Sequence, residues 1–125
     1  RAILHAIEKT SKNTGLVLNL ALNYSGRMEI VEAVKKIARD VKANKLNVND
    51  VDEERFSSYL FTHPLPDPDL LIRTSGEMRL SNFLLWQTSY TELFITETLW
   101  PDFSEREFVE IVLEYQKRER RFGKL

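Results

Sequence analysis

Residues 69–82 read DLLIRTSGEMRLSN, and this stretch decides the fold. Its first five residues have the length and composition of a β-strand, and the three prolines just before them exclude regular structure there. The following loop leads to a predicted compact helix over 83–90 and then to a further strand over 93–95. Strands that alternate with helices in this way indicate a parallel sheet.

The sequence upstream of this stretch continues the alternation. It predicts a helix over 1–12, a strand over 16–23 (LVLNLALN) and a long amphipathic helix over 27–43. Asp52 is a candidate N-cap of a further, short helix. We therefore expect an α/β fold in which helices flank a layered parallel sheet.

The sequence downstream predicts one last helix. Ser104 and Glu107 have the spacing of a capping box, and the helix is expected to bury its apolar positions Phe108, Ile111, Val112 and Tyr115. Three predicted strands make a small sheet, and the chain opens inside an amphipathic pattern without an initiating methionine. We therefore expect residues 1–125 to be the C-terminal part of one longer domain.

The composition narrows the class of protein. The 125 residues carry a net charge of −1, which provides no general field that would attract nucleic acid. No cysteine is present, so disulfides and thiolate metal sites are excluded, and no apolar run approaches the roughly 20 residues of a membrane span. The sequence predicts a soluble, cytoplasmic protein in which a few placed residues bind any anion.

The loop after the strand at 69–73 carries the candidate binding residues. Ligands of parallel α/β sheets bind at the carboxyl ends of strands, and Arg73 and Arg79 provide guanidinium groups that match phosphate oxygens in pairs. Ser81 stands at the start of the predicted helix, where free N–H groups favour an anion. The residues thus indicate a diphosphate site. The alternative is that the arginines pair with local acids such as Glu77, and that Ser81 is only an N-cap.

Three blocks of this sequence resemble a known family. Residues 69–93, DLLIRTSGEMRLSNFLLWQTSYTEL, strongly resemble the signature region of cis-prenyltransferases of the undecaprenyl pyrophosphate synthase type. LNLALNYSGRMEIVEAV (18–34) resembles an earlier block of that family, and WPDF (100–103) followed by RERRFG (118–123) resembles its C-terminal block. The resemblance implies that the protein condenses isopentenyl diphosphate onto an allylic diphosphate such as farnesyl diphosphate. The expected product is a long-chain polyprenyl diphosphate with cis double bonds, of the type that carries cell wall precursors, and the expected cofactor is Mg²⁺.

The resemblance also implies roles for single residues. Arg73, Arg79 and Ser81 match the positions that hold the diphosphate of isopentenyl diphosphate, and Glu92 matches the acidic residue at the magnesium position. A carboxylate beside a diphosphate needs a bridging cation, because like charges otherwise repel. The alternative for Glu92 is a surface carboxylate. Met78 departs from the family, since histidine is common there and a thioether is a poor magnesium ligand.

Further positions follow from the same resemblance. Arg121 and Gly123 match an Arg-x-Gly element that closes the active site, often in contact with the partner subunit of a dimer, so a homodimer is expected. The alternative for this basic tail is complementation of a helix dipole. Asn23 and Arg27 match positions close to the active-site cleft; alternatively, Asn23 only ends a strand and Arg27 only starts a helix.

The family's other essential motif has no counterpart in residues 1–125. It is an Asp-Gly-Asn-Gly-Arg-Trp type loop that binds the allylic diphosphate and supplies the main magnesium-linked aspartate. We therefore expect no catalytic residue in this chain, and we expect that these 125 residues alone do not elongate farnesyl diphosphate. The alternative function is a non-catalytic regulatory or binding subunit that completes an active site in a partner.

Overall fold

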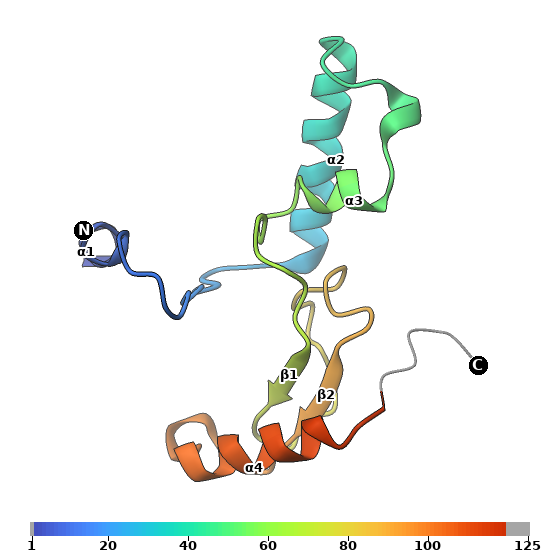
Figure 1. The fold of residues 1–125 in the computed structure, drawn as a ribbon. Helices are drawn as coiled ribbons and strands as arrows, with labels where there is room; N and C mark the ends of the chain where they lie inside the picture. Colours follow the sequence, from blue (N-terminus) through green and yellow to red (C-terminus); the bar gives the residue numbers. More distant parts are fainter. Residues whose placement is uncertain (1, 120–125) are drawn as a thin grey trace.

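A computed structural model describes residues 2–119, with two parallel strands in the middle of an elongated molecule (Figure 1). Helices α2 and α3 lie at one end, α4 lies at the other, and α1 stands apart from the rest. This arrangement confirms the predicted α/β class. The elements in chain order are α1 (Ala2–Thr10), α2 (Gly26–Lys42), the 3₁₀ helix η1 (Val48–Asp50), α3 (Glu53–Ser57), β1 (Leu70–Arg73), β2 (Glu92–Ile95), the 3₁₀ helix η2 (Trp100–Asp102) and α4 (Glu105–Gln116).

The sheet consists of β1 and β2, whose backbones pair in parallel with Leu70 opposite Glu92 and Arg73 opposite Ile95. Both predicted strands are confirmed within one residue of their expected ends. Because the strands are parallel, the loops that follow Arg73 and Ile95 leave the sheet at the same edge.

The N-caps of α2 and α3 explain where these helices begin. Ser25 accepts a hydrogen bond from the backbone N–H of Met28 at 3.3 Å, and Asp52 accepts one from that of Arg55 at 2.7 Å. Short polar side chains at the N-cap satisfy donors that have no partner within the helix. The predicted long helix and the predicted cap at Asp52 are both confirmed.

The predicted strand over 16–23 is wrong. The segment has no regular structure, and Leu16 at its start is 92% exposed. A parallel strand exists only through hydrogen bonds to a neighbouring strand. Among the described residues only β1 and β2 pair as strands, so the apolar run of 16–23 has no strand beside it.

The predicted helix over 83–90 is also wrong. Ser81, Asn82 and Leu84 have φ angles of 50°, 64° and 44°, which lie outside the right-handed helical region. The chain forms successive turns there instead. Trp86 packs against Phe56 with 4.5 Å between the ring centroids, so this segment covers α3 without being a helix itself.

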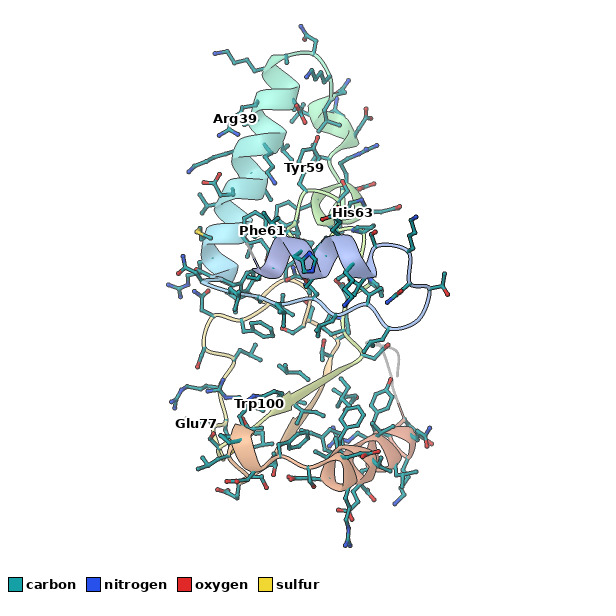
Figure 2. The ribbon with its side chains drawn as sticks, turned by 90° about the vertical axis from the view of Figure 1, so that its left-hand side faces the viewer. Arg39, Tyr59, Phe61, His63, Glu77 and Trp100 are labelled. Carbon is teal, nitrogen blue, oxygen red and sulfur yellow. The ribbon has the colours of Figure 1, made fainter. Side chains whose placement is uncertain are left out.

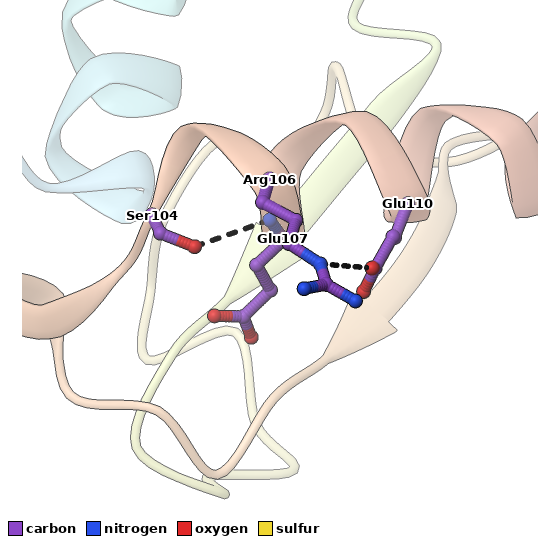
Figure 3. Close-up of polar contacts among 4 residues, drawn as sticks. All are labelled: Ser104, Arg106, Glu107 and Glu110. Atoms are coloured by element: carbon purple, nitrogen blue, oxygen red, sulfur yellow. Dashed lines mark hydrogen bonds and ion pairs between the residues drawn. The ribbon is translucent and has the colours of Figure 1, made fainter.

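Helix α4 begins at the predicted capping residue. Ser104 accepts a hydrogen bond from the backbone N–H of Glu107 at 3.2 Å, and Arg106 pairs with Glu110 one turn along the helix (Figure 3). The Glu107 carboxylate accepts a hydrogen bond from the hydroxyl of Thr96, so it ties α4 to the end of β2. The predicted burial of Phe108 is wrong, because its side chain is 47% exposed; Ile111, Val112 and Tyr115 are half-buried.

The apolar core of the described residues is small. Ala33 and Leu60 are the apolar side chains that are fully buried, whereas many large apolar side chains of α1, α4 and residues 16–22 are exposed. None of the helices between residues 2 and 119 combines the length and the apolar character that a bilayer crossing requires.

Candidate functional site

The carboxyl edge of the sheet holds the loop that starts at Arg73. The backbone N–H of Thr96 donates to the carbonyl of Arg73 at 2.9 Å, and that of Gly76 donates to the carbonyl of Thr96 at 2.8 Å. Gly76 has a φ of 66°, and a Cβ atom there would lie 2.5 Å from a carboxylate oxygen of Glu97. The loop after β1 is therefore fixed against the chain that follows β2, and the positive φ at this contact favours glycine.

The two arginines of this loop have different surroundings. The Nε atom of Arg73 is buried and has no hydrogen-bond partner within residues 2–119. Arg79 forms an ion pair with Glu77, and its side chain is 65% exposed. The alternative of pairing with local acids is thus confirmed for Arg79. An exposed pair of this kind contributes little free energy, so an incoming anion can replace Glu77.

Figure 2 locates the Arg79 partner in the molecule. Glu77 lies near Trp100, at the end of the molecule that contains α4, whereas Tyr59 and Phe61 lie toward α2. From Glu77 the loop leads to Asn82 at the N-terminus of α2. It therefore joins the carboxyl edge of the sheet to the first turn of this helix.

Asn82, directly after Ser81, contacts the first turn of α2. The carbonyl of Asn82 accepts a hydrogen bond from the N–H of Gly26 at 2.8 Å, and its side-chain oxygen accepts one from the N–H of Arg27 at 2.9 Å. Its side-chain nitrogen donates to the hydroxyl of Ser25 at 2.8 Å. The structure thus brings Ser81 close to Arg27, although 54 positions separate them in the sequence.

The first N–H groups of α2 are all occupied. Asn82 accepts from two of them, and the side chain and carbonyl of Ser25 accept from those of Met28 and Glu29. An anion therefore cannot bind to free N–H groups of α2 in this arrangement. The donors left for an anion at this place are the Ser81 hydroxyl and the guanidinium of Arg27.

Asn23 borders a cavity of about 490 Å³ beside the first turn of α2. It has a φ of 51°, a left-handed conformation that asparagine tolerates. The cavity is mostly apolar, and its lining consists of residues 19–24 with Met28, Phe61, Thr62, Phe83 and Leu84.

A buried polar cluster underneath this region was not predicted. Glu29 is 1% exposed, and its carboxylate accepts hydrogen bonds from the N–H of Phe61 at 2.7 Å, from Gln87 at 3.1 Å and from the Tyr24 hydroxyl. Burial and the Glu29 carboxylate raise the pKa of Tyr24 above its usual range. Glu29 and Ala33, four residues apart, are both buried, so the inward face of α2 passes through them. In the sequence, the four-residue spacing of Glu29 and Ala33 in an amphipathic helix was the signal that Glu29 lies on the buried face.

Glu92 lies at the opposite end of the sheet from Arg73. It starts β2 opposite Leu70, so three residues, about 10 Å along the strand, separate it from the level of Arg73. Its carboxylate pairs with Arg118 at 2.6 Å, and that guanidinium lies over the ring of Phe94 at 3.8 Å.

The described residues supply only part of a magnesium site. No group of three or more acidic, histidine or cysteine side chains among residues 2–119 could hold a metal ion. Glu92 offers one carboxylate, and Mg²⁺ usually takes one or two carboxylates together with substrate phosphates and water. These residues therefore fit a magnesium ion only as one ligand among several, and Arg118 competes with the ion for the Glu92 carboxylate.

The structure thus distributes the predicted site residues over three places. Arg73 ends β1 and Arg79 lies in the loop that follows, while Ser81, Arg27 and Asn23 lie around the first turn of α2. Glu92 lies at the far end of β2 with Arg118. Arg121 and Gly123 lie outside the described residues.

Comparisons with known proteins show the family to which the chain belongs. The family model described as "Putative undecaprenyl diphosphate synthase" matches residues 1–123. An isoprenyl transferase from Heliobacterium mobile is 60% identical over 98% of this chain and 47% of its own length. A tritrans,polycis-undecaprenyl-diphosphate synthase (geranylgeranyl-diphosphate specific) from Thermoplasma acidophilum is 50% identical over 99% of this chain and 48% of its own length.

A solved structure is similar to this chain in both fold and sequence. Lavandulyl diphosphate synthase from Lavandula x intermedia, in complex with dimethylallyl diphosphate, superimposes with a TM-score of 0.94 at 43% identity. The match covers 98% of this chain and 53% of that protein. The chain spans about half the length of the relatives it matches. With a family match over nearly every residue, the chain belongs to the undecaprenyl diphosphate synthase family of cis-prenyltransferases.

Proposed function

We propose that the protein elongates an allylic diphosphate with isopentenyl diphosphate to give a long-chain polyprenyl diphosphate of the undecaprenyl type. In this proposal the present chain supplies the site for isopentenyl diphosphate. The names of the relatives support prenyl transfer as the reaction class. No observation favours the non-catalytic subunit as an alternative.

The loop from Arg73 to Ser81 carries the proposal. It presents one guanidinium with a buried Nε that lacks a partner within residues 2–119, and a second one held only by an exposed ion pair. A guanidinium binds phosphate oxygens through paired hydrogen bonds and stays charged at physiological pH. Ser81 adds a hydroxyl donor within two residues of Arg79. In this proposal a diphosphate replaces Glu77 at Arg79, and Arg73 and Ser81 provide further hydrogen-bond donors from the same segment.

The remaining parts of the proposal concern groups beyond this loop. Glu92 would contribute one carboxylate to Mg²⁺, which would neutralise diphosphate charge when bound. Met78 would not contribute, because a thioether is a poor ligand for this ion. Arg121 and Gly123 would close the site in a cytoplasmic homodimer. The allylic substrate in this proposal is an isoprenoid diphosphate, since one relative is named for geranylgeranyl diphosphate and one solved structure holds dimethylallyl diphosphate.

Calorimetry with isopentenyl diphosphate tests the site. In the full-length protein, Arg79→Ala should weaken binding by about 10- to 100-fold, because hydrogen bonds to a charged group contribute about 1.5–3 kcal/mol. Arg39→Ala is the matched control, since Arg39 lies near the far end of α2 (Figure 2). Equal affinity of the wild type and Arg79→Ala would refute the assignment.

A further inference from the structure

Asn82 joins the proposed diphosphate loop to α2 through its side-chain amide and its backbone carbonyl. Its side-chain oxygen accepts from the N–H of Arg27 at 2.9 Å, and its side-chain nitrogen donates to the hydroxyl of Ser25 at 2.8 Å. Its backbone carbonyl oxygen accepts a hydrogen bond from the N–H of Gly26 at 2.8 Å. These contacts bridge 55 to 57 positions of sequence, so they hold two segments that the chain itself does not hold together.

The backbone on both sides of the contact is shaped for it. Ser81 and Asn82 both have left-handed φ angles, 50° and 64°, and asparagine is among the few residues that adopt this conformation readily. On the helix side, a Cβ atom on Gly26 would lie 3.0 Å from the Asn82 carbonyl oxygen. Both segments thus contain residues that permit a close approach.

The contact determines where the neighbouring donors lie. Ser81 directly precedes Asn82, and Arg79 is three residues away, which is at most about 10 Å along the chain. Arg27 is held from the other side through its own N–H. A site binds more tightly when its donors are already in place, since binding then costs less ordering.

The geometry points to Asn82 as a positioning residue, which holds Ser81 and Arg79 in place for the diphosphate of isopentenyl diphosphate without itself binding it. This inference rests on the proposed function. Asn82 has no role in the reaction in this view, so its loss should affect affinity for isopentenyl diphosphate and leave the turnover of bound substrate nearly unchanged.

Asn82→Gly in the full-length protein tests the inference, because glycine keeps the left-handed backbone and removes only the side chain. We expect the Kd and KM for isopentenyl diphosphate to rise about tenfold, as for the loss of two hydrogen bonds, with kcat within about threefold and the KM for the allylic substrate unchanged. Asn44→Gly is the matched control. Asn44 has a φ of 55° just beyond the other end of α2. Its side chain forms no hydrogen bond within residues 2–119.

A second variant keeps the test decisive if Asn82→Gly does not fold. Ser25→Ala removes the acceptor of the Asn82 side-chain nitrogen, and it should raise the Kd for isopentenyl diphosphate about threefold. Unchanged Kd in both variants, while Arg79→Ala loses affinity, would overturn the role of Asn82 and leave the proposed function intact. If the wild type and Arg79→Ala bind isopentenyl diphosphate equally, the proposed function itself fails. A fall in kcat with unchanged KM in Asn82→Gly would also overturn the inference.

Discussion

At the scale of single residues, Gly26 lies in a close contact between α2 and the segment that contains Asn82. A Cβ atom there would lie 3.0 Å from the Asn82 carbonyl oxygen and 3.0 Å from the Leu85 side chain. We expect Gly26→Ala to lower the free energy of unfolding by about 1–2 kcal/mol, because neither neighbour can move without disturbing the loop. Gly15→Ala is the control, since a Cβ there has open space, and it should be neutral or slightly stabilising. Urea unfolding of the full-length protein measures both, and an unchanged midpoint for Gly26→Ala would contradict the prediction.

Tyr24 should give the stability a specific pH dependence. Its hydroxyl donates to the buried Glu29 carboxylate, and burial together with this carboxylate raises its pKa. A raised pKa means that the folded state favours the protonated hydroxyl, so its contribution is complete below the ordinary tyrosine pKa of about 10 and falls as pH rises above it. Tyr24→Phe should cost about 1–2 kcal/mol at pH 7, and less at higher pH. Urea unfolding at pH 7 and at about pH 10.5 measures this, and a constant difference would argue against it.

The residues of the site differ in how far the sequence reveals them. Arg73, Arg79 and Ser81 could be proposed from residue type and from their place after a strand. The partners of Asn82 and Glu29 could not, since residues such as Arg27 and Gln87 are more than 50 positions away from them. A single sequence does not show which distant segments meet.

At the scale of elements, the N-cap of α4 is a local feature with a measurable effect. Ser104 accepts from the N–H of Glu107, and replacing such a cap with alanine usually costs about 1 kcal/mol. We expect this loss for Ser104→Ala in thermal unfolding of the full-length protein. Ser104→Asp should retain most of the stability, because a carboxylate also caps a helix and favours its N-terminal dipole. Equal destabilisation by both variants would show that the cap is not the cause.

The elements that were predicted correctly carry their signals within a few residues. Helices α2, α3 and α4 begin at capping side chains, and β1 follows a run of prolines. The two wrong elements depend on their surroundings. Residues 16–23 have strand composition without a neighbouring strand, and the segment after Asn82 turns because its backbone meets α2. Local propensity cannot decide such cases, since tertiary contacts override it.

At the scale of the whole molecule, the chain exposes much more surface than a compact protein. Its accessible surface is 10595 Å², whereas a folded monomer of 14.7 kDa exposes about 6,900 Å². The apolar residues 16–22 and the apolar side chains of α1 and α4 account for part of this difference. Burial of apolar surface is the main favourable contribution to folding, so the stability of this half-length chain by itself should be low.

The last prediction follows from this surface and from the composition of the site. We expect the 125-residue chain, when purified alone, to lack a cooperative thermal transition and to form no polyprenyl product from isopentenyl and farnesyl diphosphates with Mg²⁺. The first result follows from the small core, because cooperativity requires packed apolar contacts that Ala33 and Leu60 alone cannot supply. The second follows because residues 1–125 contain no counterpart of the Asp-Gly-Asn-Gly-Arg-Trp type loop that the resemblance implies for the allylic diphosphate. Near-ultraviolet circular dichroism during heating measures the transition, and incorporation of labelled isopentenyl diphosphate measures the product, with the isoprenyl transferase from Heliobacterium mobile as the control. A sharp transition would mean that copies of this chain cover each other's apolar surface, and product formation would mean that they also complete the site.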